Sequence, residues 1–204
     1  MAIFLLVRHG QNDSIGKRLA GRLPGLHLNE AGKAQADRLA KLLKNLPIIA
    51  VYASPLERTQ ETAQPIAQPH HLPVETVPAL IELDFGDWQG QELETLKQNA
   101  LWNQVQGHPS DHCFPGGETF AEAQSRVVKK LLDLNDQFES KDMVVCVAHG
   151  DVIRLAVAYF LGLPLDNFQR LRTTPASVTV LNLQEGKVSF GPINYSMEFP
   201  EFSD

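Results

Sequence analysis

The stretch MVVCVAHGDVIRLAVAYFL, residues 143–161, gives the clearest indication of the fold class of this chain. Its apolar first part, residues 143–147, is typical of a buried strand, and the apolar pattern over residues 151–161 predicts a helix. A strand that turns directly into a helix is the building unit of an α/β protein. The turn between the two, Ala148-His149-Gly150, places a histidine at the end of the strand.

Four other segments have the composition of short strands, being rich in Val, Ile, Leu or Tyr. They lie at residues 3–7, 48–52, 74–77 and 178–183, and the turn Gln184-Glu185-Gly186 predicts a hairpin with a last strand at 187–191. Because helical patterns separate the first strands, the sheet is expected to be largely parallel. The expected fold is an α/β fold, a three-layer α/β/α sandwich with a mostly parallel central sheet.

Three helix starts carry capping signals. Asn29 is the predicted N-cap of a helix with leucines at helical spacing. Thr119 and Glu122 have the spacing of a capping box before another apolar stripe. Ser54, with Glu57 three residues later, is interpreted in the same way.

Residues 84–117 do not follow the strand–helix alternation. They are rich in Gln, Asn, Gly, Pro and aromatic residues, which predicts an insertion with one short helix in a single domain spanning residues 1–204. Such insertions commonly cover active sites. Trp88, Trp102 and Phe114 are expected either to roof a pocket or to pack the insertion onto the domain.

Composition and charge narrow the function classes. The 204-residue chain is 43% hydrophobic and 21% charged, as globular proteins are, and its formal net charge of −6 argues against nucleic-acid binding. The apolar run at its start is too short for a signal peptide or a membrane span, and two cysteines give no disulfide framework. We therefore expect a cytoplasmic protein without membrane association. The tail at residues 194–204 leaves two arrangements open, packing on its own domain or contact in a homodimer.

Two histidines and two arginines are expected to meet at one edge of the sheet. One strand ends in Arg8-His9-Gly10, the next is followed by Arg58 in the first turn of a helix, and a third ends at His149. In open α/β sheets, ligands bind at the carboxyl ends of the parallel strands. Helix N-termini, guanidinium groups and histidine all favour an anion there. Each residue alone has an ordinary structural explanation, but their coincidence predicts a phosphate site.

A histidine in such a site can act as a nucleophile toward phosphorus. It needs one ring nitrogen free and the other held by a hydrogen bond, and the Gly10 carbonyl is the expected acceptor for His9. Arg8, Arg58 and His149 are expected to stabilise charge on the transferred phosphoryl group. This chemistry requires neither a metal nor another cofactor.

The leaving alcohol needs a proton donor. Glu82, in the stretch ALIELDFGDWQG after the third strand, is the candidate, because its apolar neighbours favour a neutral carboxyl group. Asp84 and Asp87 in the same stretch are the alternatives.

The residues of five ordered motifs carry a resemblance to a known family. LLVRHGQ, SPLERTQETAQPIA, IELDFGDWQG, FPGGETFAE and VVCVAHGDVIRLAVAYFLGLP resemble the successive motifs of the histidine phosphatase superfamily, in the branch that contains the phosphoglycerate mutases. The resemblance covers about residues 4–183. It implies a phosphoglycerate mutase-like α/β/α fold, with His9 as the nucleophile that becomes phosphohistidine, Glu82 as the proton donor, and the phosphoryl ligands Arg8, Arg58 and His149.

The resemblance implies a metal-independent phosphomonoesterase that acts on a small phosphorylated metabolite. FGDWQG and PGGETF are more similar to the phosphatases of the branch than to its mutases, and Ser14-Ile15 stands where mutases usually carry Trp-Asn. A cofactor-dependent phosphoglycerate mutase is the first alternative. The second is a non-catalytic module that binds phosphorylated partners, which the presence of all five catalytic positions disfavours.

Five further residues are candidates for substrate binding. Asn12 is expected to replace the missing asparagine of the mutase pattern at the phosphate, while Gly10 and Gly150 leave room for it. Arg18 and Arg22 are expected either to meet a second anionic group of the substrate or to belong to a solvated basic loop.

Overall fold

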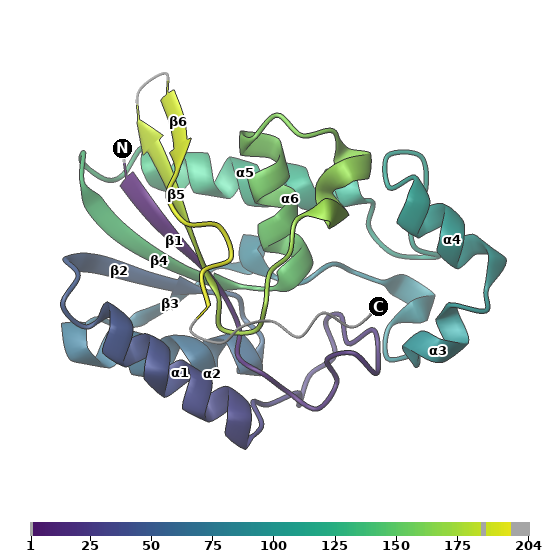
Figure 1. The fold of residues 1–204 in the computed structure, drawn as a ribbon, viewed down its shortest axis with the longest axis horizontal. Helices are drawn as coiled ribbons and strands as arrows, with labels where there is room; N and C mark the ends of the chain where they lie inside the picture. Colours follow the sequence, from purple (N-terminus) through teal and green to yellow (C-terminus); the bar gives the residue numbers. More distant parts are fainter. Residues whose placement is uncertain (1, 185–186, 197–204) are drawn as a thin grey trace.

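The computed structural model describes residues 2–184 and 187–196, which form one mixed sheet with helices on both faces (Figure 1). The six strands lie in the order β3-β2-β4-β1-β5-β6. Their bounds are β1 Ala2–Arg8, β2 Ile48–Ala53, β3 Val74–Thr76, β4 Asp142–Ala148, β5 Val178–Gln184 and β6 Lys187–Phe190. Every predicted strand is present.

The first four strands run parallel, and the last two are antiparallel. β1 pairs with β4, and β2 with β4 and β3, in parallel register, whereas β5 runs antiparallel to β1 and β6 antiparallel to β5. The predicted hairpin is confirmed by the pairing of Gln184 with Lys187, while its turn residues Glu185 and Gly186 lie outside the described residues. The mostly parallel sheet is therefore confirmed.

Helices pack on both faces of the sheet, which gives the predicted three layers. They are α1 Glu30–Leu43, α2 Glu57–Ala67, α3 Leu93–Leu96, α4 Ala100–Gly107, α5 Phe120–Asn135 and α6 Gly150–Phe160, with short 3-10 segments η1 Gln68–His70, η2 Pro78–Leu80, η3 Gly86–Trp88 and η4 Leu165–Arg170. Because side chains alternate along β1, Leu5 and Val7 join the core under α1 and α2, and Phe4 and Leu6 join the core under α5 and α6. In Figure 1 the first helix pair lies below the sheet and the second above it.

Two of the three predicted caps form. The Asn29 side chain accepts from the Gly32 amide at 3.0 Å, and Thr119 and Glu122 make a complete capping box. The third prediction is wrong. Helix α2 begins at Glu57, so Leu56 and not Ser54 occupies the N-cap position, and Leu56 makes no side-chain cap bond. The Ser54 hydroxyl is hydrogen-bonded to His149 instead.

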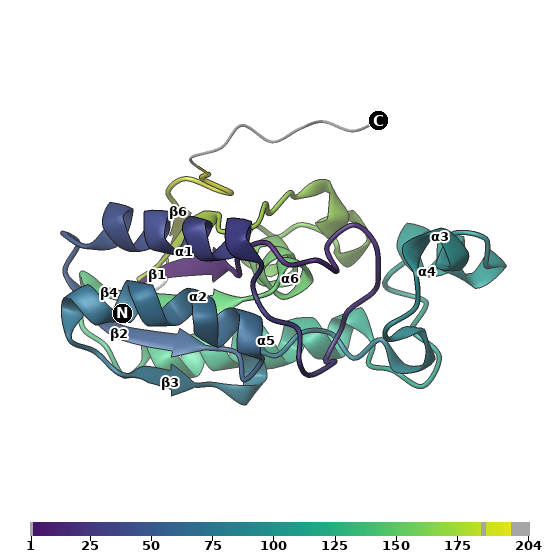
Figure 2. The same cartoon turned by 90° about the horizontal axis from the view of Figure 1, so that it is seen from below.

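The segment 84–117 contains two short helices, α3 and α4, where one was predicted. Figure 2 shows both at one end of the molecule, apart from the three layers. Trp88 and Phe114 are buried and pack edge to face with their ring centroids 5.8 Å apart, and the Phe114 ring lies 5.0 Å from that of Phe120 in α5. Trp102 lies 5.6 Å from Trp88. These three aromatic residues therefore pack the insertion onto the domain, the second of the two roles expected for them.

None of the described helices is both long enough and apolar enough to cross a lipid bilayer.

Candidate active site

His9 follows the last residue of β1 and is fixed in one orientation. Its Nδ1 lies 2.8 Å from the Gly10 carbonyl oxygen, which can only accept, so Nδ1 carries the proton and Nε2 keeps its lone pair. The Gly10 amide in turn donates to Thr62 Oγ1 at 3.0 Å. Burial, together with the charges of Arg8 and Arg58, holds the pKa of His9 well below its ordinary value. A neutral imidazole with a free Nε2 is a competent nucleophile.

Two arginines bring unpaired N–H groups to this histidine. Arg58, 1% exposed, donates from Nη2 to the Gly21 carbonyl at 2.8 Å, and Arg8 donates from Nη1 to the Thr173 carbonyl at 2.5 Å. Within the described part of the chain, Arg58 Nη1 and Arg8 Nε are buried and have no hydrogen-bond partner. Because a buried unpaired donor is costly, this pair of guanidinium groups fits an anion with several oxygens.

His149, which follows β4, lies beside His9 with the ring centroids 5.3 Å apart. Its Nε2 is 2.8 Å from Ser54 Oγ, and its Nδ1 is 3.3 Å from Arg58 Nη2. Since the guanidinium can only donate, Nδ1 is the acceptor and Nε2–H donates to Ser54. Burial first, and then the neighbouring positive charges, lower the pKa of His149 well below its ordinary value.

Glu82 is the carboxyl group closest to the two histidines. Its Oε2 lies 3.9 Å from His149 Nδ1, and its Oε1 accepts from the Leu83 amide at 3.0 Å. The side chain is 13% exposed, and burial raises its pKa above the ordinary value against the opposing effect of Arg58. Of its two competitors, Asp84 accepts from Arg22 and from the Gly86 amide, and Asp87 is exposed.

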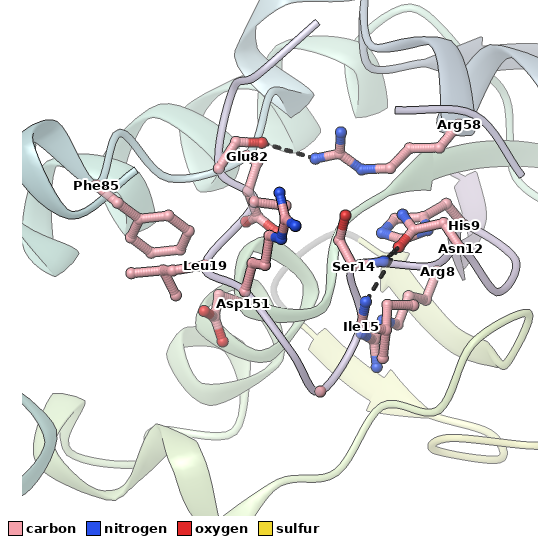
Figure 3. A pocket seen from close by; sticks show the side chains of 14 residues that line it. Arg8, His9, Asn12, Ser14, Ile15, Leu19, Arg58, Glu82, Phe85 and Asp151 are labelled. Atoms are coloured by element: carbon pink, nitrogen blue, oxygen red, sulfur yellow. Dashed lines mark hydrogen bonds between the residues drawn. The ribbon is translucent and has the colours of Figure 1, made fainter. Parts of the chain in front are cut away.

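Arg8, His9, Arg58 and Glu82 line a cavity of about 150 Å³ beyond the carboxyl ends of the parallel strands, and His149 is buried beside His9 outside this lining. Figure 3 shows Arg8, His9, Arg58 and Glu82 directed toward the same space. The loop after β1, residues 12–21, supplies most of the remaining lining, and Phe85 and Asp151 complete it. The insertion thus contributes Phe85 to the cavity.

The predicted substrate residues fall into three groups. Asn12 and Arg18 line the cavity, where Asn12 Oδ1 accepts from the Ser14 and Ile15 amides and so shapes the loop (Figure 3).

Gly10 and Gly150 serve close packing. A Cβ on Gly10 would stand 2.7 Å from the Gly32 carbonyl oxygen of α1, and one on Gly150 would stand 3.3 Å from the Arg8 guanidinium. Substrate contact by these two glycines stays a prediction.

Arg22 lies outside the cavity lining. Its guanidinium is paired with Asp84 and Glu118 at 3.1 and 2.9 Å. Neither of the roles expected for Arg22 describes this geometry, because its guanidinium is engaged in a partly buried network of ion pairs.

Three partners of the site were not found from the sequence. Ser54 and Thr62 support His149 and Gly10, and the Thr173 carbonyl holds Arg8. The position of Ser54, just after a strand that ends at the site, could have indicated a role there. A serine at this position is equally typical of a helix N-cap, so the sequence does not separate the two roles. Thr173 lies 165 residues from Arg8 along the chain, and nothing in its local sequence marks it.

The site combines a neutral histidine with a free Nε2, unpaired cationic donors and a largely buried carboxyl group, and comparison with protein families shows where such a chain belongs. The model of the histidine phosphatase superfamily (branch 1) matches residues 4–195. The chain belongs to the histidine phosphatase superfamily.

Similar proteins agree with this assignment. An uncharacterized protein of Mycobacterium tuberculosis is 54% identical over 86% of this chain and 87% of its own length. "Phosphoserine phosphatase 1" of Hydrogenobacter thermophilus is 30% identical over 99% of this chain and 96% of its own. A solved structure of mycobacterial glucosyl-3-phosphoglycerate phosphatase superposes with a TM-score of 0.87 at 27% identity, covering 95% of this chain and 99% of that one. The chain is a phosphatase of this superfamily, and its fold is phosphoglycerate mutase-like.

Proposed function

We propose that this phosphatase is a metal-independent phosphomonoesterase that hydrolyses small phosphate esters through a phosphohistidine on His9. The observation that carries the proposal is the state of His9. Its Nδ1–H is bound to the Gly10 carbonyl, and it stands beside the unpaired donors Arg58 Nη1 and Arg8 Nε.

In the first step, His9 Nε2 attacks phosphorus and the bond to the ester oxygen breaks. The carboxyl proton of Glu82 passes to that oxygen, and the alcohol leaves. In the second step, the Glu82 carboxylate takes a proton from water as the water oxygen attacks phosphorus. The P–N bond breaks, its electron pair returns to Nε2, and inorganic phosphate leaves.

Arg8, Arg58 and His149 stabilise the phosphoryl oxygens during both steps. His149 is neutral beside the arginines, but a bound phosphate dianion adds negative charge and favours protonation of Nδ1. On protonation Nδ1 gives up the hydrogen bond that it accepts from Arg58 Nη2, and both N–H groups then donate to phosphoryl oxygens.

The cavity indicates a small substrate. Its volume of about 150 Å³ is well below the ~300–1,000 Å³ of pockets for larger ligands, so it suits a phosphoryl group with a short leaving group. Arg18 in the lining fits an anionic group on that leaving group, such as a carboxylate. The chain forms one domain, and its insertion contacts the bound substrate through Phe85.

The test is release of inorganic phosphate from 4-nitrophenyl phosphate, followed by a screen of small phosphate esters that includes phosphoserine and 3-phosphoglycerate. His9→Ala should abolish release, EDTA should leave it unchanged, and acid-labile protein-bound phosphate should be trapped in the active enzyme alone. His108→Ala, at the exposed end of α4, is the matched control. Turnover by His9→Ala would contradict the proposal.

The same screen separates the phosphatase from the mutase alternative. With 3-phosphoglycerate and its bisphosphate primer present, we expect inorganic phosphate and glycerate. Formation of 2-phosphoglycerate as the main product would assign phosphoryl transfer instead.

A further inference from the structure

Glu82, the proton donor of the proposed mechanism, lies on no helix or strand. It follows η2 in irregular backbone, and its Oε1 accepts a hydrogen bond of 3.0 Å from the adjacent Leu83 amide. Its position therefore depends on its backbone. The Glu82 carbonyl oxygen accepts from two guanidinium groups, Arg22 Nε at 2.9 Å and Arg126 Nη2 at 3.2 Å.

Glu118 joins these two arginines. Its Oε1 accepts from Arg22 Nη2 at 2.9 Å, from Arg126 Nη2 at 2.8 Å and from the Asp84 amide at 2.9 Å, while its Oε2 accepts from Arg126 Nε at 3.1 Å. The Glu118 side chain is 14% exposed. Charge-assisted bonds at this burial are strong, and removal of the shared carboxylate leaves two cations facing each other.

The network spans three separate segments of the chain. Arg22 belongs to the loop after β1, next to Gly21, whose carbonyl binds Arg58. Arg126 comes from α5 and also donates to the Ala79 carbonyl at 2.7 Å, at the start of the stretch that carries Glu82. The network therefore fixes the Glu82 backbone against the loop that lines the cavity.

We propose that Glu118 is a positioning residue for Glu82, acting through Arg126 and Arg22 to hold the carboxyl group at the leaving oxygen. The inference rests on the proposed function, because it assigns Glu82 the proton transfer. Proton transfer is sensitive to small displacements of the donor, so a loosened backbone impairs this step more than phosphoryl binding.

The experiment compares two substrates of similar size that differ in their need for a proton. The 4-nitrophenolate ion is a stable leaving group, whereas benzyl alkoxide must be protonated as it leaves. Rates of hydrolysis of 4-nitrophenyl phosphate and benzyl phosphate are measured for the wild type, Glu118→Ala, Arg126→Met and Arg22→Met. Glu82→Gln is the reference. Glu122→Ala is the control, since Glu122 lies in the first turn of α5, four residues after Glu118, and its carboxylate accepts from Thr119 in the capping box rather than from Arg22 or Arg126.

We expect Glu118→Ala to lose about tenfold or more additional activity on benzyl phosphate relative to 4-nitrophenyl phosphate, as a share of the ~10²–10⁴-fold that general acid catalysis supplies. Glu82→Gln should show a still larger loss on benzyl phosphate relative to 4-nitrophenyl phosphate. Glu118→Gln, which keeps an acceptor oxygen, should show a smaller relative loss than Glu118→Ala. Glu122→Ala should lower stability without changing the ratio of the two rates.

Equal losses on both substrates, or none, in Glu118→Ala would overturn the inference while Glu82→Gln still discriminates. If Glu82→Gln itself fails to discriminate, the proton-donor role falls and the inference falls with it. If Glu118→Ala does not fold, Arg22→Met decides the question, because Arg22 is partly exposed and its loss removes one of the two bonds to the Glu82 carbonyl.

Discussion

At the scale of single residues, the two active-site histidines carry their protons on different nitrogens. His9 donates from Nδ1 to the Gly10 carbonyl, whereas His149 donates from Nε2 to Ser54. In each histidine, one hydrogen bond fixes which ring nitrogen carries the proton. The other ring nitrogen keeps its lone pair, and this is Nε2 in His9 and Nδ1 in His149. His9 thereby presents Nε2 for attack, and His149 presents Nδ1 to Arg58.

Ser54→Ala tests this division of roles. The variant leaves the buried Nε2–H of His149 without an acceptor, so we expect a loss of about 1–3 kcal/mol in the free energy of unfolding and a fall in kcat. Urea denaturation and phosphate release measure the two effects. Ser125→Ala, on the exposed face of α5, is the matched control. Unchanged stability and turnover in Ser54→Ala would show that the tautomer is set by something else.

Among the helices and strands, the contact between the end of β1 and the start of α1 holds the backbone around His9, the proposed nucleophile. Gly10 and Gly32 lie against each other, and a Cβ on Gly32 would stand 2.0 Å from the Gln11 carbonyl oxygen. The Asn29 amide also donates to that carbonyl at 3.1 Å. The first turn of α1 therefore holds the backbone that follows His9, and Figure 2 shows the loop after β1 extending from this end of the sheet.

Gly32→Ala is expected to lower both stability and activity, because the backbone at Gln11 must shift to make room. Gly107→Ala is the matched control: a Cβ there meets nothing within 4 Å, so the substitution should be neutral or stabilising by about 0.5–1 kcal/mol. Thermal denaturation and the rate of phosphate release compare the two variants. Full activity in Gly32→Ala would mean that α1 does not align His9.

At the scale of the whole molecule, a chain of net charge −6 folds around a cationic site with two buried neutral histidines. Below pH 6.5 folding keeps these imidazoles unprotonated, whereas the histidines of the unfolded chain take up protons. Both are faced by Arg8 and Arg58, and Glu82 is the carboxyl group closest to them. The stability of the fold is therefore linked to pH through its own active site.

The sign of this linkage follows from the lowered pKa values of His9 and His149. Above pH 6.5 both histidines are neutral in the folded and in the unfolded state. As the pH falls below 6.5, the unfolded state binds protons first, so the free energy of unfolding decreases until the pH reaches the lower pKa values of the folded state. The raised pKa of Glu82 has the opposite effect on stability. As the pH rises above 4.5, the carboxyl group of the unfolded chain loses its proton first, so the free energy of unfolding falls with rising pH.

His149→Gln should reduce the loss of stability below pH 6.5 by up to about 1.4 kcal/mol per pH unit, since it removes one of these titrating groups. Urea unfolding of the wild type and the variant at several pH values between 7 and 5 measures the slope. An identical slope in both proteins would show that His149 is not neutral in the folded state.

The alternation of strands and helices, and the residues at three strand ends, could be predicted from the amino-acid sequence. Local patterns suffice there, because strand composition and the caps at Asn29 and Thr119 depend on neighbouring residues. The motif residues Arg8, His9, Arg58 and His149 meet as expected, since parallel strands bring their carboxyl ends to one edge.

The hydrogen-bond and ion-pair partners of the polar groups, in contrast, depend on the three-dimensional fold. Ser54 has the local pattern of a cap, yet its hydroxyl binds a histidine 95 residues away. Arg22 has the position of a substrate ligand, yet its charge is taken by Glu118, 96 residues away. The physical reason is that hydrogen bonds and ion pairs are made between groups that are close in space, and the sequence specifies such distances only through the packing of the whole fold.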